Sequence, residues 1–558
     1  MTKAYEVGCN KLIAKGKYQE AIVGLEFILK TNAAQASVYR SLATCHENLK
    51  NWREAIINIL KTLGHGSYQA DDLLQLINIL EKSELRSYLP ALNKPLTLAL
   101  SSPTLEFYAI PLLWKQLTHK YPKVLQQLNT SFNDEISQLL QDPVFCLLLE
   151  RSLINDYFTE NLILLCRKEM LSQLWAKKNI EKYQPFLASL ACTSLLNDGL
   201  YYTDETDKAF LSALNNKKAL TSTELLVLIN YSSFDTVMTL WQAHQALLQA
   251  DLFKNIRSDL QLYCQAASSQ DKGDITQATS KVVQSFYMEN PYPKWKNIKL
   301  KKNLQPDTAS KKNVLIAGCG TGKQLVSYAL EYPKHTITAI DLSPTSLTFA
   351  KLMTQKYNIT NINFQIMDIL NVADLSQSFD LIMSTGVIHH MSSPLDGLMA
   401  LSKVLSANGR ILLGLYSSTA RKDLQKIKRD ILTFLETDEA NITREGVKQW
   451  RAQISNEYKK KPVCKMPDFF YLNGLYDLLF HPQQTEYTLI EVEELLEQCG
   501  LSFDAMNVKN NTQLEKSFCN TPMPLGERNL NYWHKIESEY PYTFISMYNF
   551  LASKIDNT

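Results

Sequence analysis

The spacing of apolar residues changes once along the chain. Up to about residue 266, apolar positions recur every three to four residues, as in Leu73-Leu74-x-Leu76-Ile77-x-Ile79-Leu80, which is typical of helices packed on a core. From Asn313 onward, short apolar runs alternate with helical stretches. The pattern predicts an all-α N-terminal region followed by an α/β region.

Five apolar runs after Asn313 are expected to be strands: 314–317, 336–340, 362–367, 381–383 and 410–415. Ser343-Pro344 and Ser393-Pro394 each place an N-cap and a first-turn proline at the start of an intervening helix. Gly409 is expected to close the second of these helices. Strands that alternate with helices predict a parallel sheet covered on both faces.

The first 62 residues repeat with a shift of 34, which is the tetratricopeptide period. The shift superposes aromatic on aromatic and small on small residues: Tyr5 on Tyr39, Tyr18 on Trp52 and Ala21 on Ala55. The region resembles two tetratricopeptide repeats, 5–33 and 39–62. An ordinary pair of helical hairpins is the alternative. The helices that follow, up to Ala266, show no chemistry and are expected to cap the open end of the repeats.

Length and charge narrow the class of protein. At roughly 100–200 residues per domain, 558 residues predict about three to five domains. A formal net charge of +2 disfavours a dedicated nucleic-acid or membrane-surface binder. The ten cysteines form no Cys-x-x-Cys pair, the start lacks a signal-peptide core, and no apolar run reaches a membrane-spanning length. We therefore expect a cytoplasmic protein without a membrane span and without a nucleic-acid partner.

The turn after the first predicted strand reads Gly318-Cys319-Gly320-Thr321-Gly322. Glycines there let the backbone approach a ligand and leave helix N-terminal amides free. The dinucleotide fingerprint does not fit, because its third glycine would fall at Lys323. A P-loop does not fit either, because it needs glycine at Ala317 and a hydroxyl residue at Gln324.

A G-x-G-x-G turn resembles motif I of the class I S-adenosylmethionine-dependent methyltransferases, and three further motifs follow in register. Asp341 ends the second strand, where the family's acidic residue binds the ribose hydroxyls. Asp368 ends the third strand, where the family's carboxylate takes the adenine amino group, and 379–391 resembles the fourth-strand motif. Alternatively, Asp341 is a helix N-cap and Asp368 a turn residue. The resemblance implies S-adenosylmethionine as cofactor, held by Gly318, Cys319, Gly320, Gly322, Asp341, Leu342, Asp368, Ile369 and Thr385. Cys319 is expected to fill space there rather than to act as a nucleophile.

The family's closing antiparallel pair is expected at 501–506 and 542–550, so that residues 417–500 form an insertion. Such an insertion overhangs the edge where a substrate enters, and its aromatic and ionisable residues suit a lid or a substrate pocket. A helical subdomain with its own core is the alternative. Asp477 and His481 share one helical face and are candidates for an oriented base pair. The predicted domains are 1–66 (repeats), 67–266 (helical), 267–312 (linker), 313–416 and 501–558 (Rossmann-like core, seven strands), and 417–500 (insertion).

An aromatic and proline cluster, 285–295, precedes motif I and contains Asn290-Pro291-Tyr292-Pro293. Segments at this point of the family often fold over the cofactor, so Tyr287, Tyr292 and Trp295 are candidate cover residues, whose ring faces favour a sulfonium cation. A structural clamp that joins the helical and catalytic domains is equally consistent with the cluster.

Methyl transfer to a hydroxyl or an ammonium group requires removal of a proton, and His389, His390 and His481 are the candidate bases. One of the adjacent imidazoles, His389 or His390, is alternatively structural. No metal site is predicted. The chain resembles bacterial fusions of tetratricopeptide repeats to a class I methyltransferase, which implies a protein or peptide substrate bound with help from the repeats, and a lysine or other side-chain amine as acceptor.

Two observations bear on that acceptor. Ser384-Thr385-Gly386 stands where arginine methyltransferases carry paired glutamates, which disfavours arginine. Val387-Ile388-His389-His390 also looks like small-molecule members, so an O-methyltransferase for a small molecule, lipid or glycan is the second hypothesis. The third is an interaction protein that senses the cofactor without turnover. The sequence leaves the oligomeric state open.

Overall fold

A computed structural model describes residues 2–31, 35–65, 70–83, 89–101, 107–108, 117, 120–121, 124, 132–268, 273–296, 298, 310–507 and 529–555. They fall into two compact units. The first comprises Met1–Thr193, Phe210–Asn230 and Lys296–Asn303, and the second comprises Ser194–Ala209, Tyr231–Trp295 and Leu304–Thr558. Much of the predicted linker, including 269–272 and 299–309, lies outside the described residues.

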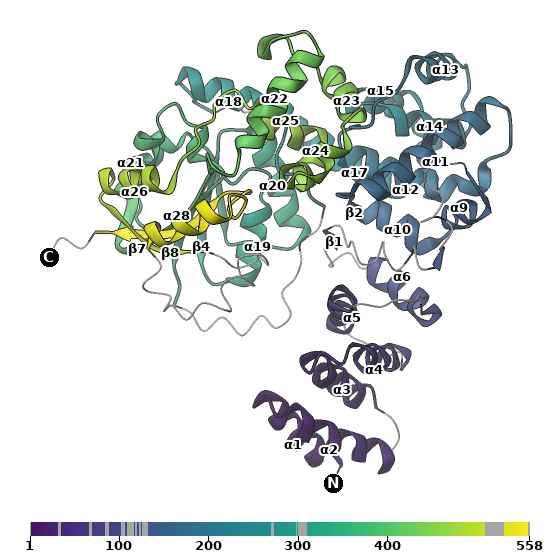
Figure 1. Cartoon of the computed structure of the whole chain (residues 1–558), viewed down its shortest axis with the longest axis horizontal. Helices are drawn as coiled ribbons and strands as arrows, with labels where there is room; N and C mark the ends of the chain where they lie inside the picture. The colour runs from purple at the N-terminus through teal and green to yellow at the C-terminus, as the bar shows by residue number, and fades with distance from the viewer. Residues whose placement is uncertain are drawn as a thin grey trace. The chain divides into compact units, whose positions relative to one another are not determined.

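The first unit begins with tandem helical hairpins (Figure 1): α1 (Thr2–Ala14), α2 (Tyr18–Thr31), α3 (Ala36–Asn48), α4 (Trp52–Gly64) and α5 (Ala70–Lys82). The start of α3 follows that of α1 by 34 residues, as does the start of α4 that of α2. Small residues lie buried between the helices, among them Ala21, Ala43 and Ala55 at 0% exposure. Helix spacing and small-residue contacts therefore follow the period seen in the sequence.

Further helices continue the first unit: α6 (Asn93–Ser101), α9 (Asp134–Leu139), α10 (Pro143–Arg151), α11 (Tyr157–Trp175) and α14 (Ser222–Tyr231). Asp142 caps α10 by accepting the Val144 N–H at 2.8 Å. Two short strands, β1 (Phe107–Tyr108) and β2 (Ser152–Leu153), pair in parallel. This small sheet was not predicted.

The second unit contains a seven-stranded sheet in the order β5-β4-β3-β6-β7-β9-β8. Its strands are β3 (Asn313–Ala317), β4 (Thr336–Asp341), β5 (Ile362–Ile366), β6 (Phe379–Thr385), β7 (Leu405–Leu415), β8 (Leu501–Met506) and β9 (Tyr548–Lys554). β3 to β7 pair in parallel, and β9 runs antiparallel to both β7 and β8. The predicted Rossmann-like sheet with an antiparallel closing pair is confirmed.

Alternate residues of β3 enter the cores on opposite faces of this sheet. Val314 and Ile316 belong to one buried cluster, whereas Leu315 and Ala317 belong to another. The first cluster includes side chains of α19 (Lys323–Glu331) and α20 (Pro344–Lys356). The second includes side chains of α21 (Pro394–Val404), α26 (Leu489–Gln498) and α28 (Leu530–Glu539). Helices cover both faces, which is why the strands read as continuous apolar runs.

Two boundary predictions were wrong. The last strand begins at Tyr548 rather than at residue 542, because the preceding residues form tight turns in which Thr543 N bonds Tyr540 O at 3.0 Å. Gly409 does not end a helix. α21 already ends at Val404 and β7 begins at once, so Gly409 lies inside the strand, where a Cβ would stand 2.9 Å from Phe379 O.

The insertion after β7 is mainly helical. It contains α22 (Lys422–Phe434), α23 (Arg444–Ala452), α24 (Asn456–Lys460) and α25 (Leu472–Phe480). Phe469 and Phe470 are buried, and the guanidinium of Arg451, also in the insertion, lies 5.6 and 5.3 Å from their ring centroids, so part of the aromatic content packs within the insertion. Tyr471 instead stacks on Tyr292, outside the insertion.

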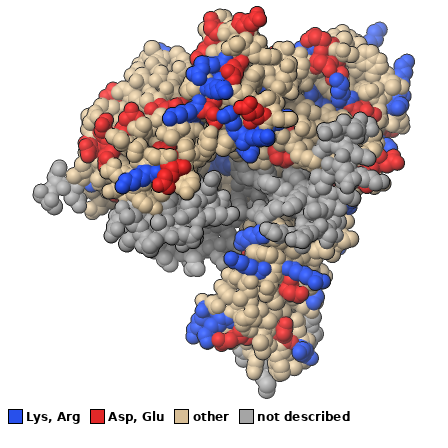
Figure 2. Space-filling model, in the orientation of Figure 1, with Lys and Arg blue, Asp and Glu red and all other residues tan. Residues whose placement is uncertain are grey.

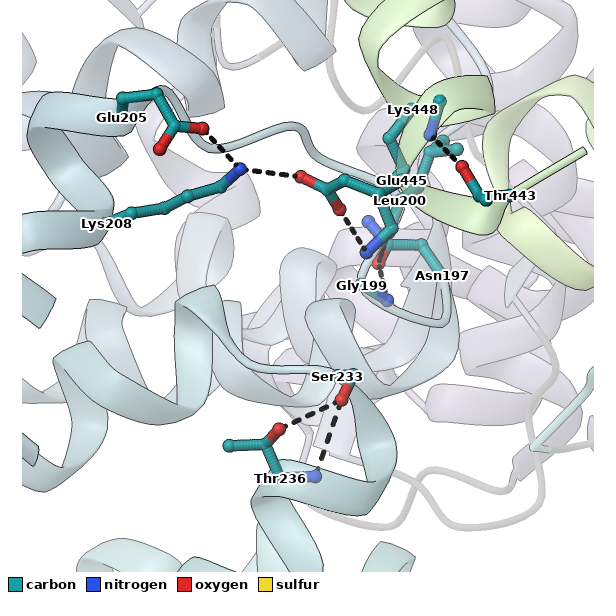
Figure 3. A network of polar contacts seen from close by, with 11 residues as sticks. Asn197, Gly199, Leu200, Glu205, Lys208, Ser233, Thr236, Thr443, Glu445 and Lys448 are labelled. Atoms are coloured by element: carbon teal, nitrogen blue, oxygen red, sulfur yellow. Dashed lines mark hydrogen bonds and ion pairs between the residues drawn. The ribbon is translucent and has the colours of Figure 1, made fainter. Parts of the chain in front are cut away.

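A short segment, Ser194–Ala209, packs with the insertion in the second unit. Leu472 N donates to Asn197 O at 3.0 Å, and Asn473 N donates to the Asp198 carboxylate at 3.2 Å. Figure 3 shows Lys208 between Glu205 and Glu445, at 2.8 and 3.3 Å. These contacts tie the insertion to a segment more than 230 residues earlier in the chain.

Lysine and arginine are interspersed with aspartate and glutamate on the face shown in Figure 2, as the small net charge suggests. Among the described residues, no helix has the length and apolar character needed to cross a membrane.

Candidate active site

The glycine-rich turn after β3 needs glycine at three positions. Gly318, Gly320 and Gly322 have φ values of 78°, 52° and 86°, a region that side chains with a Cβ rarely adopt. A Cβ on Gly318 would lie 2.4 Å from Val387 Cγ2, and one on Gly320 would lie 2.7 Å from Tyr292 O. The backbone of the turn is thus open on its cavity side and closely packed elsewhere.

Asp341, at the end of β4, supports this turn. Its Oδ2 accepts the Gly320 N–H at 2.7 Å and its Oδ1 accepts the Ser343 N–H at 2.8 Å. Burial raises the pKa of the Asp341 carboxyl, and these amide donors oppose the rise. The N-cap of α20 is Ser343, so the alternative role of Asp341 as that cap does not apply.

Asp368, after β5, has two partners. Its Oδ1 accepts the Leu370 N–H at 3.0 Å, which makes it the N-cap of a short 3₁₀ helix, Ile369–Leu375. Its Oδ2 accepts the Ser280 hydroxyl at 2.5 Å. Asp368 is therefore a turn residue, as the alternative from the sequence had it, and it also lies on the cavity wall.

A cavity of about 500 Å³ opens at this edge of the sheet. Most of the predicted site residues lie on its wall: Tyr287, Tyr292, Gly318, Cys319, Gly320, Asp341, Leu342, Asp368, Ile369, Thr385, His390 and Asp477. The wall does not include Gly322, Trp295, His389 or His481. Glycine backbone, two strand-end carboxylates and aromatic rings around one cavity suit a sulfonium-bearing nucleoside.

The Asn290-Pro291-Tyr292-Pro293 segment links the glycine turn to the insertion. Thr321 N donates to Tyr292 O at 3.2 Å, and the Tyr292 hydroxyl donates to Asp468 at 2.8 Å. Arg444 donates to Asn290 at 2.5 Å. Trp295 lies behind the turn, where its Nε1 donates to Thr321 O at 3.2 Å.

Gln483 determines the tautomers of two neighbouring histidines, His390 and His481, whose rings are tilted by 32°. His390 Nδ1 lies 2.8 Å from Gln483 O, and since a carbonyl only accepts, Nδ1 carries the proton and Nε2 keeps the lone pair. His481 Nδ1 accepts the Gln483 N–H at 3.1 Å, so its proton is on Nε2. The two ring centroids are 3.7 Å apart.

His390, Asp477 and His481 can each offer one ligand atom, and these atoms lie within 4.8 Å of one another. A metal ion needs a lone pair from each imidazole. The hydrogen bond from Gln483 leaves a proton on His481 Nε2. The arrangement therefore presents two ligands, His390 Nε2 and the Asp477 carboxylate, and does not fit a three-ligand metal centre.

Burial determines the charge states of His390, His481 and Asp477. It lowers the pKa of His390 to about 4 and that of His481 to about 2. Burial raises the pKa of Asp477 to about 7, although the Tyr287 hydroxyl donates to the carboxylate. Both imidazoles are therefore neutral at neutral pH, where Asp477 is near its titration midpoint. Burial also raises the pKa of Cys319, whose thiol stays neutral.

Several contributors were missed from the sequence. Tyr416 lines the cavity, and its ring centroid lies 3.8 Å from that of His389 and 3.7 Å from Cζ of the Arg421 guanidinium. Arg421 in turn donates to Leu478 O at 3.1 Å. Tyr416 directly follows a predicted strand, so its position could have indicated a place at the site. Gln483 acts through its backbone, and a sequence gives no indication of such a role.

Part of the chain matches known proteins. Residues 308–461 match the family model described as a methyltransferase domain. An uncharacterised Synechococcus protein is 27% identical over 216 residues, which cover 37% of this chain and 51% of that protein. A malonyl-[acyl-carrier protein] O-methyltransferase from Acetivibrio thermocellus is 35% identical over 81 residues, 14% of this chain and 27% of that enzyme. The chain thus spans about half or less of the length of these two relatives.

Among solved structures, PKMT2 from Rickettsia typhi is 16% identical, with 51% of this chain and 55% of that chain covered and a TM-score of 0.34. That TM-score is too low to support a conclusion about function.

The sheet order, the glycine turn and the two strand-end carboxylates define a class I methyltransferase fold. Together with the family match, they show that the chain contains an S-adenosylmethionine-dependent methyltransferase domain, an enzyme domain whose cofactor is S-adenosylmethionine.

Proposed function

We propose that the chain transfers a methyl group from S-adenosylmethionine to a side-chain amine, such as that of lysine, on a protein substrate. The observation that carries this proposal is the pairing of two hydrogen-bond acceptors, His390 Nε2 and the Asp477 carboxylate, at one cavity. A neutral primary amine has two N–H groups and one lone pair. Two acceptors can hold both N–H groups, which leaves the lone pair directed at the methyl carbon.

The cofactor supplies an electrophilic methyl group when bound. Gly318, Gly320, Asp341 and Asp368 would hold it, since the turn admits no Cβ and both carboxylates reach the cavity. Of the two acceptors, ionised Asp477 is the stronger base, since its pKa is about 7 and that of His390 is about 4. Asp477 therefore takes the proton that the amine loses, while His390 Nε2 accepts the other N–H and the Gln483 carbonyl holds the His390 ring through Nδ1–H. The protein must also align the amine with the methyl group and exclude water, which can lower the activation barrier by up to roughly 7–11 kcal/mol.

The helical hairpins support a protein substrate. Their 34-residue spacing fits tetratricopeptide repeats, whose stacked helices form extended peptide-binding surfaces. Apolar side chains of the first hairpin are exposed: Tyr5 at 56%, Val23 at 69% and Phe27 at 53%. Apolar groups of this size at a surface mark an interaction site when they are contiguous, and the rings of Tyr5 and Phe27 are 5.9 Å apart.

O-methylation of a small molecule, lipid or glycan is the second candidate. A hydroxyl acceptor has one proton and needs only one of the two hydrogen-bond acceptors, and the relative from Acetivibrio thermocellus is named as an O-methyltransferase. The third is cofactor sensing without turnover.

Incubation of the protein with cell lysate and methyl-labelled S-adenosylmethionine separates the three candidates. Label in a protein fraction that is lost with Asp477→Asn supports the amine proposal. Label only in small molecules or lipids supports O-methylation. Binding of S-adenosylhomocysteine without transfer in any fraction supports sensing. Asp374→Asn is the matched control, because Asp374 is exposed on the 3₁₀ helix after Asp368.

A further inference from the structure

The guanidinium of Arg444 binds two buried asparagines that belong to different helices. Arg444 is the first residue of α23, in the insertion. Its Nη1 donates to Asn290 Oδ1 at 2.5 Å, and its Nη2 donates to Asn473 Oδ1 at 2.6 Å. Asn290 is the C-cap of α18 (Ala278–Glu289), and Asn473 lies in the first turn of α25. Each asparagine is 4% exposed. One side chain therefore joins α18 to α25.

Further contacts hold this bridge in one orientation. Asn290 Nδ2 donates to Phe286 O at 3.0 Å, so Asn290 Oδ1 is directed at Arg444. Cζ of Arg444 lies 5.3 Å from the ring centroid of Tyr476, on the helix that carries Asn473. A planar guanidinium has its donors in a fixed fork, so one arginine can serve two acceptors, for which the compact ammonium of a lysine is less well suited.

The two asparagines lie one helical turn away from the Tyr287–Asp477 hydrogen bond. Asn290 follows Tyr287 by three positions, and Asn473 precedes Asp477 by four. The Tyr287 hydroxyl donates to the Asp477 carboxylate at 2.8 Å. Residues three or four apart are neighbours on one side of a helix. α18 and α25 are thus fastened at two points, which fixes their relative direction as well as their distance.

We propose that Arg444 is a positioning residue for methyl transfer. Val283 and Tyr287 of α18 lie on the cavity wall, and α25 carries Asp477, the proposed base. Arg444 is not among the described residues of that wall, and it acts by holding the two helices at a fixed separation. This separation determines how far the amine stands from the methyl group, and a misplacement of about 1 Å can cost about 10²-fold in rate. The inference rests on the proposed function, because it takes Asp477 as the base.

The test compares Arg444→Gln with Arg429→Gln, the same change at an exposed position of α22. Transfer of label from S-adenosylmethionine to protein, in a fixed amount of cell lysate, should fall about 10-fold to 100-fold in Arg444→Gln. The dissociation constant of S-adenosylhomocysteine, measured by titration calorimetry on the full chain, should change by less than about 3-fold. Arg444→Lys, which keeps the charge and can bond one asparagine, should give an intermediate rate.

Two further readouts separate positioning from stability. If α18 and α25 move apart, the Tyr287–Asp477 hydrogen bond weakens. The rise of methyl transfer with pH, expected near the Asp477 pKa of about 7, should then move to higher pH. Hydrogen exchange of the amides of α18 and α25 should be faster in unliganded Arg444→Gln than in the wild type, whereas α26 should exchange as in the wild type.

Two results would overturn the proposal. One is Arg444→Gln labelling protein as strongly as Arg429→Gln does. The other is a loss of transfer with an unchanged pH profile and with faster exchange in α26 as well, which would mean that Arg444 only stabilises the fold. Absence of label from protein with the wild type contradicts the proposed function, and the inference falls with it. Label that Arg444→Gln does not diminish contradicts the inference alone.

Discussion

The Tyr287 hydroxyl donates to Asp477 Oδ1 at 2.8 Å across 190 positions of sequence. Tyr287 belongs to α18, which precedes the sheet, and Asp477 belongs to α25 of the insertion. Both side chains line the cavity. The pair therefore joins α18 to the segment that carries the proposed acceptor site.

Tyr287→Phe removes this donor and leaves the buried carboxylate with one partner fewer. Because the hydroxyl stabilises the ionised form, the pKa of Asp477 should rise further, by about 1–2 pH units for a hydrogen bond to a charged group. If the amine is held by ionised Asp477, methyl transfer should increase with pH through about 7 in the wild type. The increase should shift to higher pH in the variant. Tyr540→Phe, at an exposed position, should leave the profile unchanged.

Asp477→Asn should stabilise the protein at alkaline pH. Burial raises the pKa of Asp477 to about 7, above its value in the unfolded chain, so its favourable contribution is complete below about pH 4 and is lost as pH rises through 7. Asparagine stays neutral. The free energy of unfolding of the variant, relative to wild type, should therefore increase by about 2–4 kcal/mol between pH 4 and pH 8.

Calorimetric unfolding at several pH values measures this difference. Asp374→Asn is the control, because Asp374 is exposed. Its replacement should not increase the free energy of unfolding, relative to wild type, as the pH rises. A constant difference for Asp477→Asn as well would mean that Asp477 ionises freely in the folded protein.

Asp341→Asn should abolish tight cofactor binding. The carboxylate accepts amide donors from Gly320 and Ser343, and an amide side chain would turn one NH₂ group toward an N–H. Loss of hydrogen bonds to a charged group predicts roughly 10-fold to 150-fold weaker binding of S-adenosylhomocysteine by calorimetry. Unchanged affinity would remove Asp341 from the cofactor site.

Gly320→Ala separates backbone strain from close contact. The control is Gly500→Ala, because Gly320 and Gly500 both have a left-handed backbone, with φ values of 52° and 66°. That conformation costs a non-glycine residue about 1–2 kcal/mol at either position. Only at Gly320 would the new Cβ meet a backbone oxygen, that of Tyr292 at 2.7 Å. Gly320→Ala and Gly500→Ala should both lose stability, but only Gly320→Ala should lose binding of S-adenosylhomocysteine. Equal binding by the two variants would contradict the close packing of the turn.

The residues at strand ends were predictable from sequence because parallel strands bring their carboxyl ends to one edge. Apolar runs located β3 to β7, and the residues just after them, from Gly318 to Asp368, face one cavity as expected. The start of β9 was misplaced because Tyr542 and Phe544 look like strand residues, although local turns hold them.

The histidine cluster was only partly predictable. The sequence pointed to His390, Asp477 and His481, but it could not show that His390 alone of the two adjacent histidines reaches the cavity. That distinction depends on the packing of His389 against Tyr416. The proton positions depend on the backbone N–H and C=O of Gln483, which any residue except proline would provide.

The most direct test of the account is the identity of the methylated atom. Protein labelled by the wild-type enzyme is hydrolysed in acid, and methylated amino acids are identified by mass spectrometry. The account predicts N-methylated lysine or another side-chain N-methylamine. It also predicts that Asp477→Asn transfers about 10²-fold to 10⁴-fold less while binding S-adenosylhomocysteine as wild type does. Label released as methanol, as a methyl ester gives in acid, label found only in ether linkage, or equal transfer by Asp477→Asn would contradict it.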